Sequence, residues 1–165
     1  MTTDMTFAEG DHVVYPAHGV GYIEGIETQE VAGHKLQLLV ISFEDDRMKL
    51  RLPVMKAKTA GLRKLSTENM MKKALTTLGG NAKISRAMWS RRAQEYEGKI
   101  NSGNPVSIAE VIRDLHRTGD QPEQSYSERQ LYQSALERLS RELAAIEQID
   151  MDQAQGKLKS GLRAA

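Results

Sequence analysis

The sequence predicts an α+β protein: a small β barrel or strongly bent antiparallel sheet, followed by a compact all-helical unit of about five helices. Two observations support this class. Up to about residue 60, short β-branched and aromatic runs alternate with glycine or polar turns, without helical spacing between them. After Gly61 the apolar residues recur at helical spacing instead. We therefore expect a β domain over residues 1–60, a hinge over 61–66 and a helical domain over 67–165.

The β domain is expected to contain four strands, and these are placed over about residues 11–16, 20–28, 35–44 and 48–54. Gly21 and Gly25 lie inside the second strand, where interior glycines predict bulges or sharp bends. In the last strand, Lys49, Arg51 and Pro53 alternate with apolar residues. Because proline removes a donor from the hydrogen-bond ladder, this strand is expected at an edge of the sheet.

Five helices are expected after the hinge, over residues 67–78 and 82–100 and then beginning near 107, 125 and 150. Paired glycines at 79 and 80 end the first helix. Ser107 and Ser125 each precede a glutamate by three residues, which is the spacing of a capping box, and Asp150 can cap the last helix. The helix after Ser125 has the strongest apolar periodicity.

Composition excludes several classes of function. The chain has no cysteine, so disulfides and thiolate metal sites are excluded, and no two of its four histidines have metal-ligand spacing on a helix. Neither a phosphate-binding loop nor a dinucleotide fingerprint is present. No secretory signal or membrane-spanning run is found either. We expect a cytoplasmic protein, a monomer, without catalytic activity, metal or cofactor.

The net charge of +1 hides an uneven distribution along the chain. Residues 1–65 hold eight Lys and Arg against nine Asp and Glu. Residues 66–118 hold nine against five, and residues 119–165 hold six against eight, so the balances are −1, +4 and −2. A basic middle segment between acidic flanks indicates an anionic partner for that segment.

The basic segment contains an acid-free stretch from Asn69 to Gln94, whose basic residues are Lys72, Lys73, Lys83, Arg86, Arg91 and Arg92. It could bind a nucleic-acid backbone, or it could be an ordinary solvated helix face. The only tryptophan, Trp89, lies in the same stretch. An aromatic beside arginines can wedge between bases. However, Trp89 shares helical spacing with Tyr96 and Ile100, so the pattern alone favours a buried tryptophan.

The expected edge strand over residues 48–54 is the second candidate site. Such an edge can accept a strand from a partner protein. Alternatively, its lysine, arginine and proline prevent that pairing. The residues alone do not choose between these two interpretations.

Four motifs, in the same order along the chain, resemble the CarD/CdnL family of bacterial transcription regulators. The run from Gly10 to Gly21 resembles the opening of that family's β domain, and Arg51-Leu-Pro53 resembles its end. Trp89-Ser-Arg-Arg92 and the run from Glu110 to Leu115 resemble motifs of its helical domain. Transcription-repair coupling ATPases share a similar β domain, but their helicase motifs are absent here.

The resemblance implies a Tudor-like β domain that docks on the β subunit of bacterial RNA polymerase by pairing at a sheet edge, with Lys49, Arg51 and Pro53 at the contact. It further implies that the helical domain sits on promoter DNA at the upstream edge of the melted bubble and stabilises the open complex. The DNA contacts would come from Lys83, Arg86, Trp89, Arg91 and Arg92. In that arrangement Trp89 wedges into the minor groove. The resemblance therefore implies an exposed Trp89, whereas its helical spacing with Tyr96 and Ile100 favours a buried one.

Alternative interpretations follow from the same residues. The chain could be a stand-alone nucleic-acid-binding protein without sequence preference, although the −1 balance of the β domain argues against nucleic-acid binding there. It could also be a Tudor-type reader of peptides, although its aromatic residues are scattered.

Some family members carry a basic residue where this chain has Gln29 and Glu30. The terminal Ala164-Ala165 resembles tails that ClpXP-type proteases read, which predicts regulated turnover.

Overall fold

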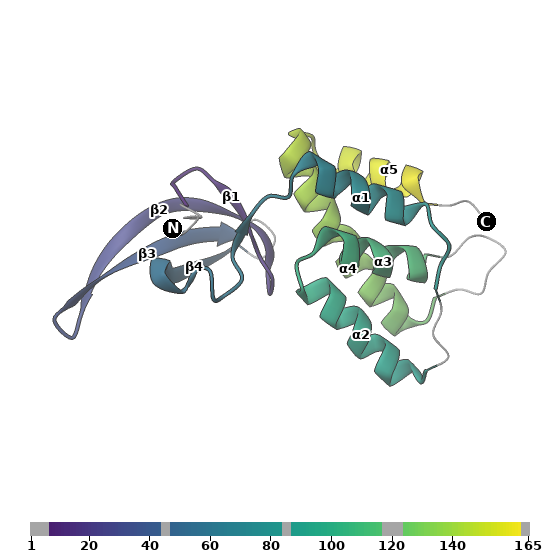
Figure 1. Ribbon diagram of the computed structural model, residues 1–165, viewed down its shortest axis with the longest axis horizontal. Coiled ribbons are helices and arrows are strands. Elements are labelled where there is room, and N and C mark those ends of the chain that lie inside the picture. The colour runs from purple at the N-terminus through teal and green to yellow at the C-terminus, as the bar shows by residue number, and fades with distance from the viewer. Residues whose placement is uncertain (1–6, 44–46, 84–86, 117–123, 163–165) are drawn as a thin grey trace. The chain divides into compact units, whose positions relative to one another are not determined.

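The computed structural model describes residues 7–43, 47–83, 87–116 and 124–162 (Figure 1). The chain divides into two units, Met1–Leu65 and Ser66–Ala165. The first unit contains the strands and the second contains the α-helices, which confirms the α+β class. No helix in the described part of the chain combines the length and the apolar character needed to cross a membrane.

The first unit is one antiparallel sheet whose strand order is β4-β3-β2-β1-β5. Its strands are β1 His12–Tyr15, β2 Gly19–Val31, β3 His34–Phe43, β4 Met48–Pro53 and β5 Arg63–Lys64, and a short 3-10 helix, η1 Val54–Lys56, follows β4. The sheet is curved and open, so of the two expected forms the bent sheet is the one found (Figure 1). β4 lies at one edge, which confirms the prediction from Pro53.

Glycines shape β2 and its hairpin with β3. Ala32 and Gly33 both have positive φ, 52° and 81°, as a two-residue type I′ hairpin turn requires. The register shifts between Ile23 and Gly25, which confirms the expected bulge. At Gly21 a Cβ atom would lie 2.7 Å from the Ile41 side chain, so only glycine lets the two strands pack this closely.

A single apolar core fills the inner face of the sheet. Its buried members are Phe7, Val13, Ile23, Leu39, Ile41, Phe43, Leu52, Ala57 and Leu62. β5 was not expected, because Arg63 and Lys64 fall in the segment interpreted as a hinge. They pair with Val14 and Val13 of β1, and two residues are too few to show strand alternation in a sequence.

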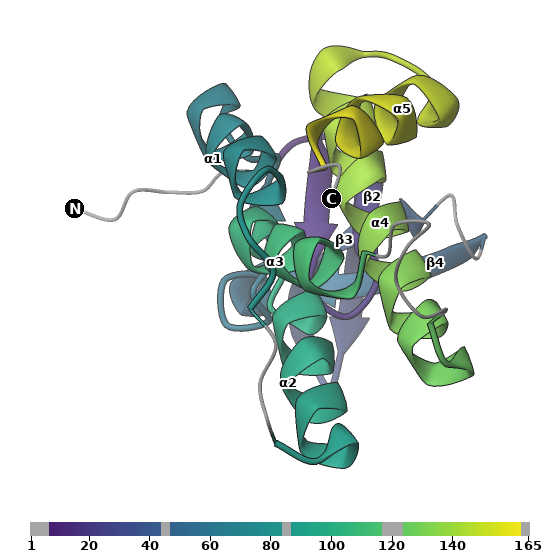
Figure 2. The ribbon, with the colours of Figure 1, turned by 90° about the vertical axis from the view of Figure 1, so that its right-hand side faces the viewer.

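The described residues of the second unit form five helices, α1 Glu68–Leu78, α2 Trp89–Asn101, α3 Pro105–Leu115, α4 Tyr126–Glu147 and α5 Met151–Gly161. α3 is the most apolar and packs against α1, α2 and α4 (Figure 2). Its buried side chains include Ile108, Val111, Ile112 and Leu115, which lie in one core with residues from the other four helices. Burial of this shared core stabilises the unit.

Three of the helix starts are as predicted. Thr67 caps α1 through the Met70 amide, and Ser125 caps α4 through the Glu128 amide. Asp150 forms a complete capping box with Gln153 at the start of α5.

Two other helix starts were predicted wrongly. α3 is not capped by Ser107: the Asn104 side chain accepts from the amides of Val106 and Ser107, and Pro105 occupies the first helical position. Asparagine followed by proline is a strong helix start, and its position before Ser107 decides the boundary. α2 begins at Trp89 instead of near residue 82. Lys83, expected within that helix, donates its backbone N–H to a carboxylate on α3.

Candidate functional site

The outer face of the edge strand β4 carries two cationic side chains that form ion pairs with glutamates of β2. Lys49 Nζ lies 3.1 Å from Glu24 Oε2, and Arg51 Nε lies 3.1 Å from Glu27 Oε2. Both glutamates belong to β2, so these side chains reach across β3. Val40 of β3 pairs with Arg51 in the ladder and is buried, although it lies outside the inner core.

These ion pairs hold the cations weakly. The side chains of Arg51 and Glu27 are 50% and 43% exposed. An ion pair this exposed contributes about 0–1 kcal/mol. A partner's carboxylate could therefore replace Glu27 at little cost. The backbone of β4 pairs with β3 on one side and with no other described strand, so the edge is open to a partner strand.

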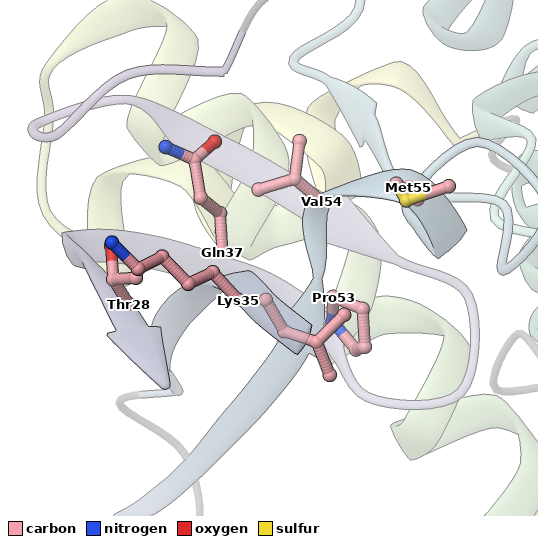
Figure 3. A pocket seen from close by; sticks show the side chains of 7 residues that line it. Thr28, Lys35, Gln37, Pro53, Val54 and Met55 are labelled. Carbon is pink, nitrogen blue, oxygen red and sulfur yellow. The ribbon is translucent and has the colours of Figure 1, made fainter. Parts of the chain in front are cut away.

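A shallow hollow of about 580 Å³ lies where β4 ends, and Figure 3 shows its side chains. It is lined by Thr28, Lys35, Leu36, Gln37, Pro53, Val54 and Met55. β4 pairs with β3 only as far as Leu38, so the hollow adjoins β3 residues that have no partner strand on this side among the described residues. Met55 is 87% exposed. The hollow thus extends the edge with apolar surface, a feature that sequence reasoning missed because its residues come from three separated segments.

The helical candidate site begins at Trp89, the first residue of α2. Trp89 is half-buried: it packs at the margin of the helical core, and its ring lies 6.3 Å from that of Tyr96. Tyr96 and Ile100 are buried, so the stripe expected from the sequence does face the core. Trp89 is less buried than the sequence pattern predicts, because it is the first residue of α2. Met88 before it is exposed and offers no side-chain cap.

The two arginines after Trp89 differ in their surroundings. Arg91 is exposed, and among the described residues its guanidinium has no hydrogen-bond or ion-pair partner. Arg92 is half-buried, and its guanidinium carbon lies 5.3 Å from the Trp89 ring centroid. The structure therefore brings Trp89, Arg91 and Arg92 together at the start of α2, although it does not present the two arginines alike.

Lys83 is exposed and precedes α2, and a buried carboxylate holds its backbone in place. Asp114 Oδ1 of α3 accepts from Lys83 N at 2.9 Å and from Arg113 Nε at 2.8 Å. This link spans 31 residues of sequence, and no local pattern indicates it. The last expected DNA contact, Arg86, lies outside the described residues.

The acid-free basic stretch is not one helix face. Lys72 and Lys73 are exposed on α1, which packs against α3 and α5, whereas Arg91 and Arg92 lie on α2, which packs against α3 and α4. Lys83 lies in the connecting segment. The stretch therefore spans two helices and the segment between them, and most of its described basic residues are exposed to solvent. Of the described basic residues in the stretch, Arg91 and Arg92 lie in the first turn of α2 with Trp89.

Comparison with known proteins accounts for both units. The model of the CarD-like/TRCF RID domain matches residues 7–66, and the model of the CarD C-terminal domain matches residues 73–159. The chain belongs to the CarD/CdnL family. Together the two models cover the β unit and nearly all of the helical unit, so the family resemblance carried by the four sequence motifs is confirmed.

One relative of known name agrees with this membership. YdeB of Bacillus subtilis (strain 168), named as a candidate transcription factor, is 32% identical over 144 residues, which are 87% of this chain and 94% of that protein. CdnLNt from Myxococcus xanthus is 35% identical with a TM-score of 0.34, covering 41% of this chain and 96% of that one. The 72-residue N-terminal domain of Myxococcus xanthus CarD is 36% identical with a TM-score of 0.32, covering 38% and 84%. The chain is a member of a family of transcription regulators, which is not an enzyme class.

Proposed function

We propose that the chain regulates transcription by docking on the β subunit of bacterial RNA polymerase through the β4 edge and by stabilising the open promoter complex through the start of α2. The half-exposed Trp89 beside the exposed Arg91 is the observation that carries the DNA part of this proposal. Family membership supports the polymerase partner. The docking site and the DNA site lie in different units of the chain.

The β4 edge supports docking in two ways. A partner strand can add to β4 because no described strand covers its outer side, and main-chain hydrogen bonds of this kind supply affinity. Lys49 and Arg51 then offer cations whose present ion pairs are exposed and weak. Pro53 ends the strand beside the hollow, where the exposed Met55 can contact an apolar side chain of the partner.

The DNA contacts would act on a duplex that polymerase has already opened. A few cations give only weak, salt-dependent affinity for DNA. Docking on polymerase raises the effective concentration of α2 near the promoter, so weak contacts become sufficient. Wedging Trp89 into the minor groove costs unstacking energy, and this cost is lowest where the bubble begins. Stronger binding to the melted promoter than to the closed one then shifts the equilibrium towards the open complex, without base readout.

The docking proposal is tested by co-elution of the full chain with purified bacterial RNA polymerase. Arg51→Glu should lose co-elution because it reverses a charge on the open edge. Arg63→Glu makes the same change on β5 at the opposite edge of the sheet and should retain co-elution. Comparison of the two variants separates the loss of a contact at the β4 edge from any general effect of reversing a charge on the sheet.

Equal co-elution of Arg51→Glu and Arg63→Glu would contradict docking through the β4 edge. If even the unaltered chain fails to co-elute, the polymerase partner is wrong. Binding of free DNA by the basic helical unit would then become the leading function.

We further propose that the chain acts in the cytoplasm as a monomer bound to polymerase at the nucleoid, and that its last two alanines mark it for a ClpXP-type protease. Ala164 and Ala165 lie outside the described residues. Changing both to aspartate should lengthen the half-life of the protein in cells. An unchanged half-life would refute the degradation signal.

A further inference from the structure

Three side chains on one face of α2 form a cluster near its first turn, in which the rings of Trp89 and Tyr96 are tilted by 48°. Trp89, Arg92 and Tyr96 are spaced by three and four residues, so they are neighbours on the helix surface. The Arg92 guanidinium carbon lies 5.3 Å from the Trp89 centroid and 5.9 Å from the Tyr96 centroid. These distances are those of cation–π contacts with both rings.

The Arg92 guanidinium lies against both rings of this cluster, and no carboxylate of the described residues forms an ion pair with it. Its Nη2 donates to the Tyr96 hydroxyl at 3.5 Å, a long contact. Its Nε is buried and has no hydrogen-bond partner among the described residues. Leaving a buried donor unsatisfied is unfavourable, so the contacts with the rings must offset that cost. Contact with the two rings would give no advantage to an arginine whose only role was to attract a phosphate.

Arg91 provides a natural comparison. It follows Trp89 by two residues and therefore points to another side of α2. It is exposed, and no described residue pairs with its guanidinium. Of the two adjacent arginines, Arg91 is therefore the one placed to reach a phosphate, whereas Arg92 is placed against Trp89.

We infer that Arg92 is a positioning residue that holds the Trp89 ring in a fixed orientation at the tip of α2, and that Arg91 makes the phosphate contact. This inference rests on the proposed function for its consequence in transcription. A side chain that is already ordered loses less freedom when it enters the DNA groove. Tyr96, buried in the core, anchors the cluster to the helical unit.

The expected effect on the open complex is moderate. Without Arg92 the Trp89 side chain must be ordered on binding, which should lower the stabilisation of open complexes by about 2- to 12-fold. This loss should be the same at every salt concentration because no phosphate contact disappears. Loss of the Arg91 contact should instead make the salt dependence shallower, by about one unit in the slope of log stabilisation against log salt.

The test compares the full chain with Arg92→Gln, Arg92→Lys, Arg91→Gln and Trp89→Ala. The first measurement is the fluorescence of the free protein, which reports this site alone because Trp89 is the only tryptophan. Arg92→Gln should shift the emission and increase quenching by acrylamide, Arg92→Lys should lie between it and the unaltered chain, and Arg91→Gln should change neither. The second measurement is the lifetime of polymerase–promoter open complexes across a series of KCl concentrations, with each variant saturating.

Arg92→Gln should shorten the lifetime by a constant factor without changing the salt slope, whereas Arg91→Gln should flatten the slope. Unchanged fluorescence in Arg92→Gln, or a slope that flattens as in Arg91→Gln, would overturn the assignment of Arg92. If Trp89→Ala leaves the lifetime unchanged, the proposed function fails instead. The fluorescence comparison still decides whether Arg92 holds the ring.

Discussion

The buried carboxylate of Asp114 provides a quantitative prediction about the segment that leads to Trp89. Asp114 on α3 accepts from Arg113 Nε at 2.8 Å and from the backbone N–H of Lys83 at 2.9 Å. The side chains of Arg113 and Asp114 are only 10% and 5% exposed. Removal of the carboxylate would leave the Arg113 cation buried with one partner fewer.

We expect Asp114→Ala to destabilise the helical unit by about 3–5 kcal/mol, the usual cost of breaking a buried ion pair from one side. With a urea m-value of about 1.5 kcal/mol/M, the unfolding midpoint should fall by about 2–3 M. The matched control is Glu110→Ala on the same helix. Glu110 pairs with Lys99 at 3.2 Å, but these side chains are 33% and 38% exposed, so the loss should be about 0–1 kcal/mol.

Urea unfolding of the full chain measures this difference directly. Trp89 is the only tryptophan and lies in the helical unit, so its fluorescence follows the unfolding of that unit. The double variant with Arg113→Met should regain much of the stability, because no buried charge is then left without its partner. A midpoint for Asp114→Ala no lower than that for Glu110→Ala would refute the reasoning.

Three further changes have expected outcomes. Met88→Ser should raise the stability of the helical unit by about 1 kcal/mol in urea unfolding, because the start of α2 has no side-chain cap. An unchanged unfolding midpoint would show that serine does not cap the helix there. Burial raises the pKa of Tyr132 above its usual value of 10, so the folded helical unit retains a proton that the unfolded chain loses. Stability should therefore fall as the pH rises above about 10, and Tyr132→Phe should flatten that fall in urea midpoints measured between pH 9 and 11. Gly21→Ala should destabilise the β unit by about 1–3 kcal/mol and lower its calorimetric Tm, because the new Cβ would overpack against Ile41. Gly25→Ala should cost less, because its Cβ would meet open space. Equal losses in the two variants would contradict the claim that the close packing at Gly21 requires glycine.

Local patterns predicted those parts of the fold that depend on local physics. The alternation around Lys49 and Arg51, with Pro53 at its end, indicated an edge strand, and β4 is one. Ser125 and Asp150 were correctly predicted as helix caps because a cap depends only on the next few residues. The same reasoning failed at the start of α3, where it chose Ser107 as the cap although Asn104, directly before Pro105, is the residue that caps the helix.

Contacts between distant residues were not predictable. Arg51 meets Glu27 across β3, and Asp114 meets Lys83 through the packing of α3 against the segment before α2. Neither pair leaves a pattern in a single sequence. Trp89 shows a further limit, because periodicity indicates which face of α2 turns inward but not how far the core extends along it.

The lifetime of the open promoter complex tests the central claim most directly. RNA polymerase would be given promoter DNA with no added protein, with the unaltered chain, or with Trp89→Ala, after co-elution has shown that both proteins bind polymerase. The account predicts a longer lifetime with the unaltered chain and a loss of most of that gain with Trp89→Ala. Equal lifetimes with and without the unaltered chain would contradict it.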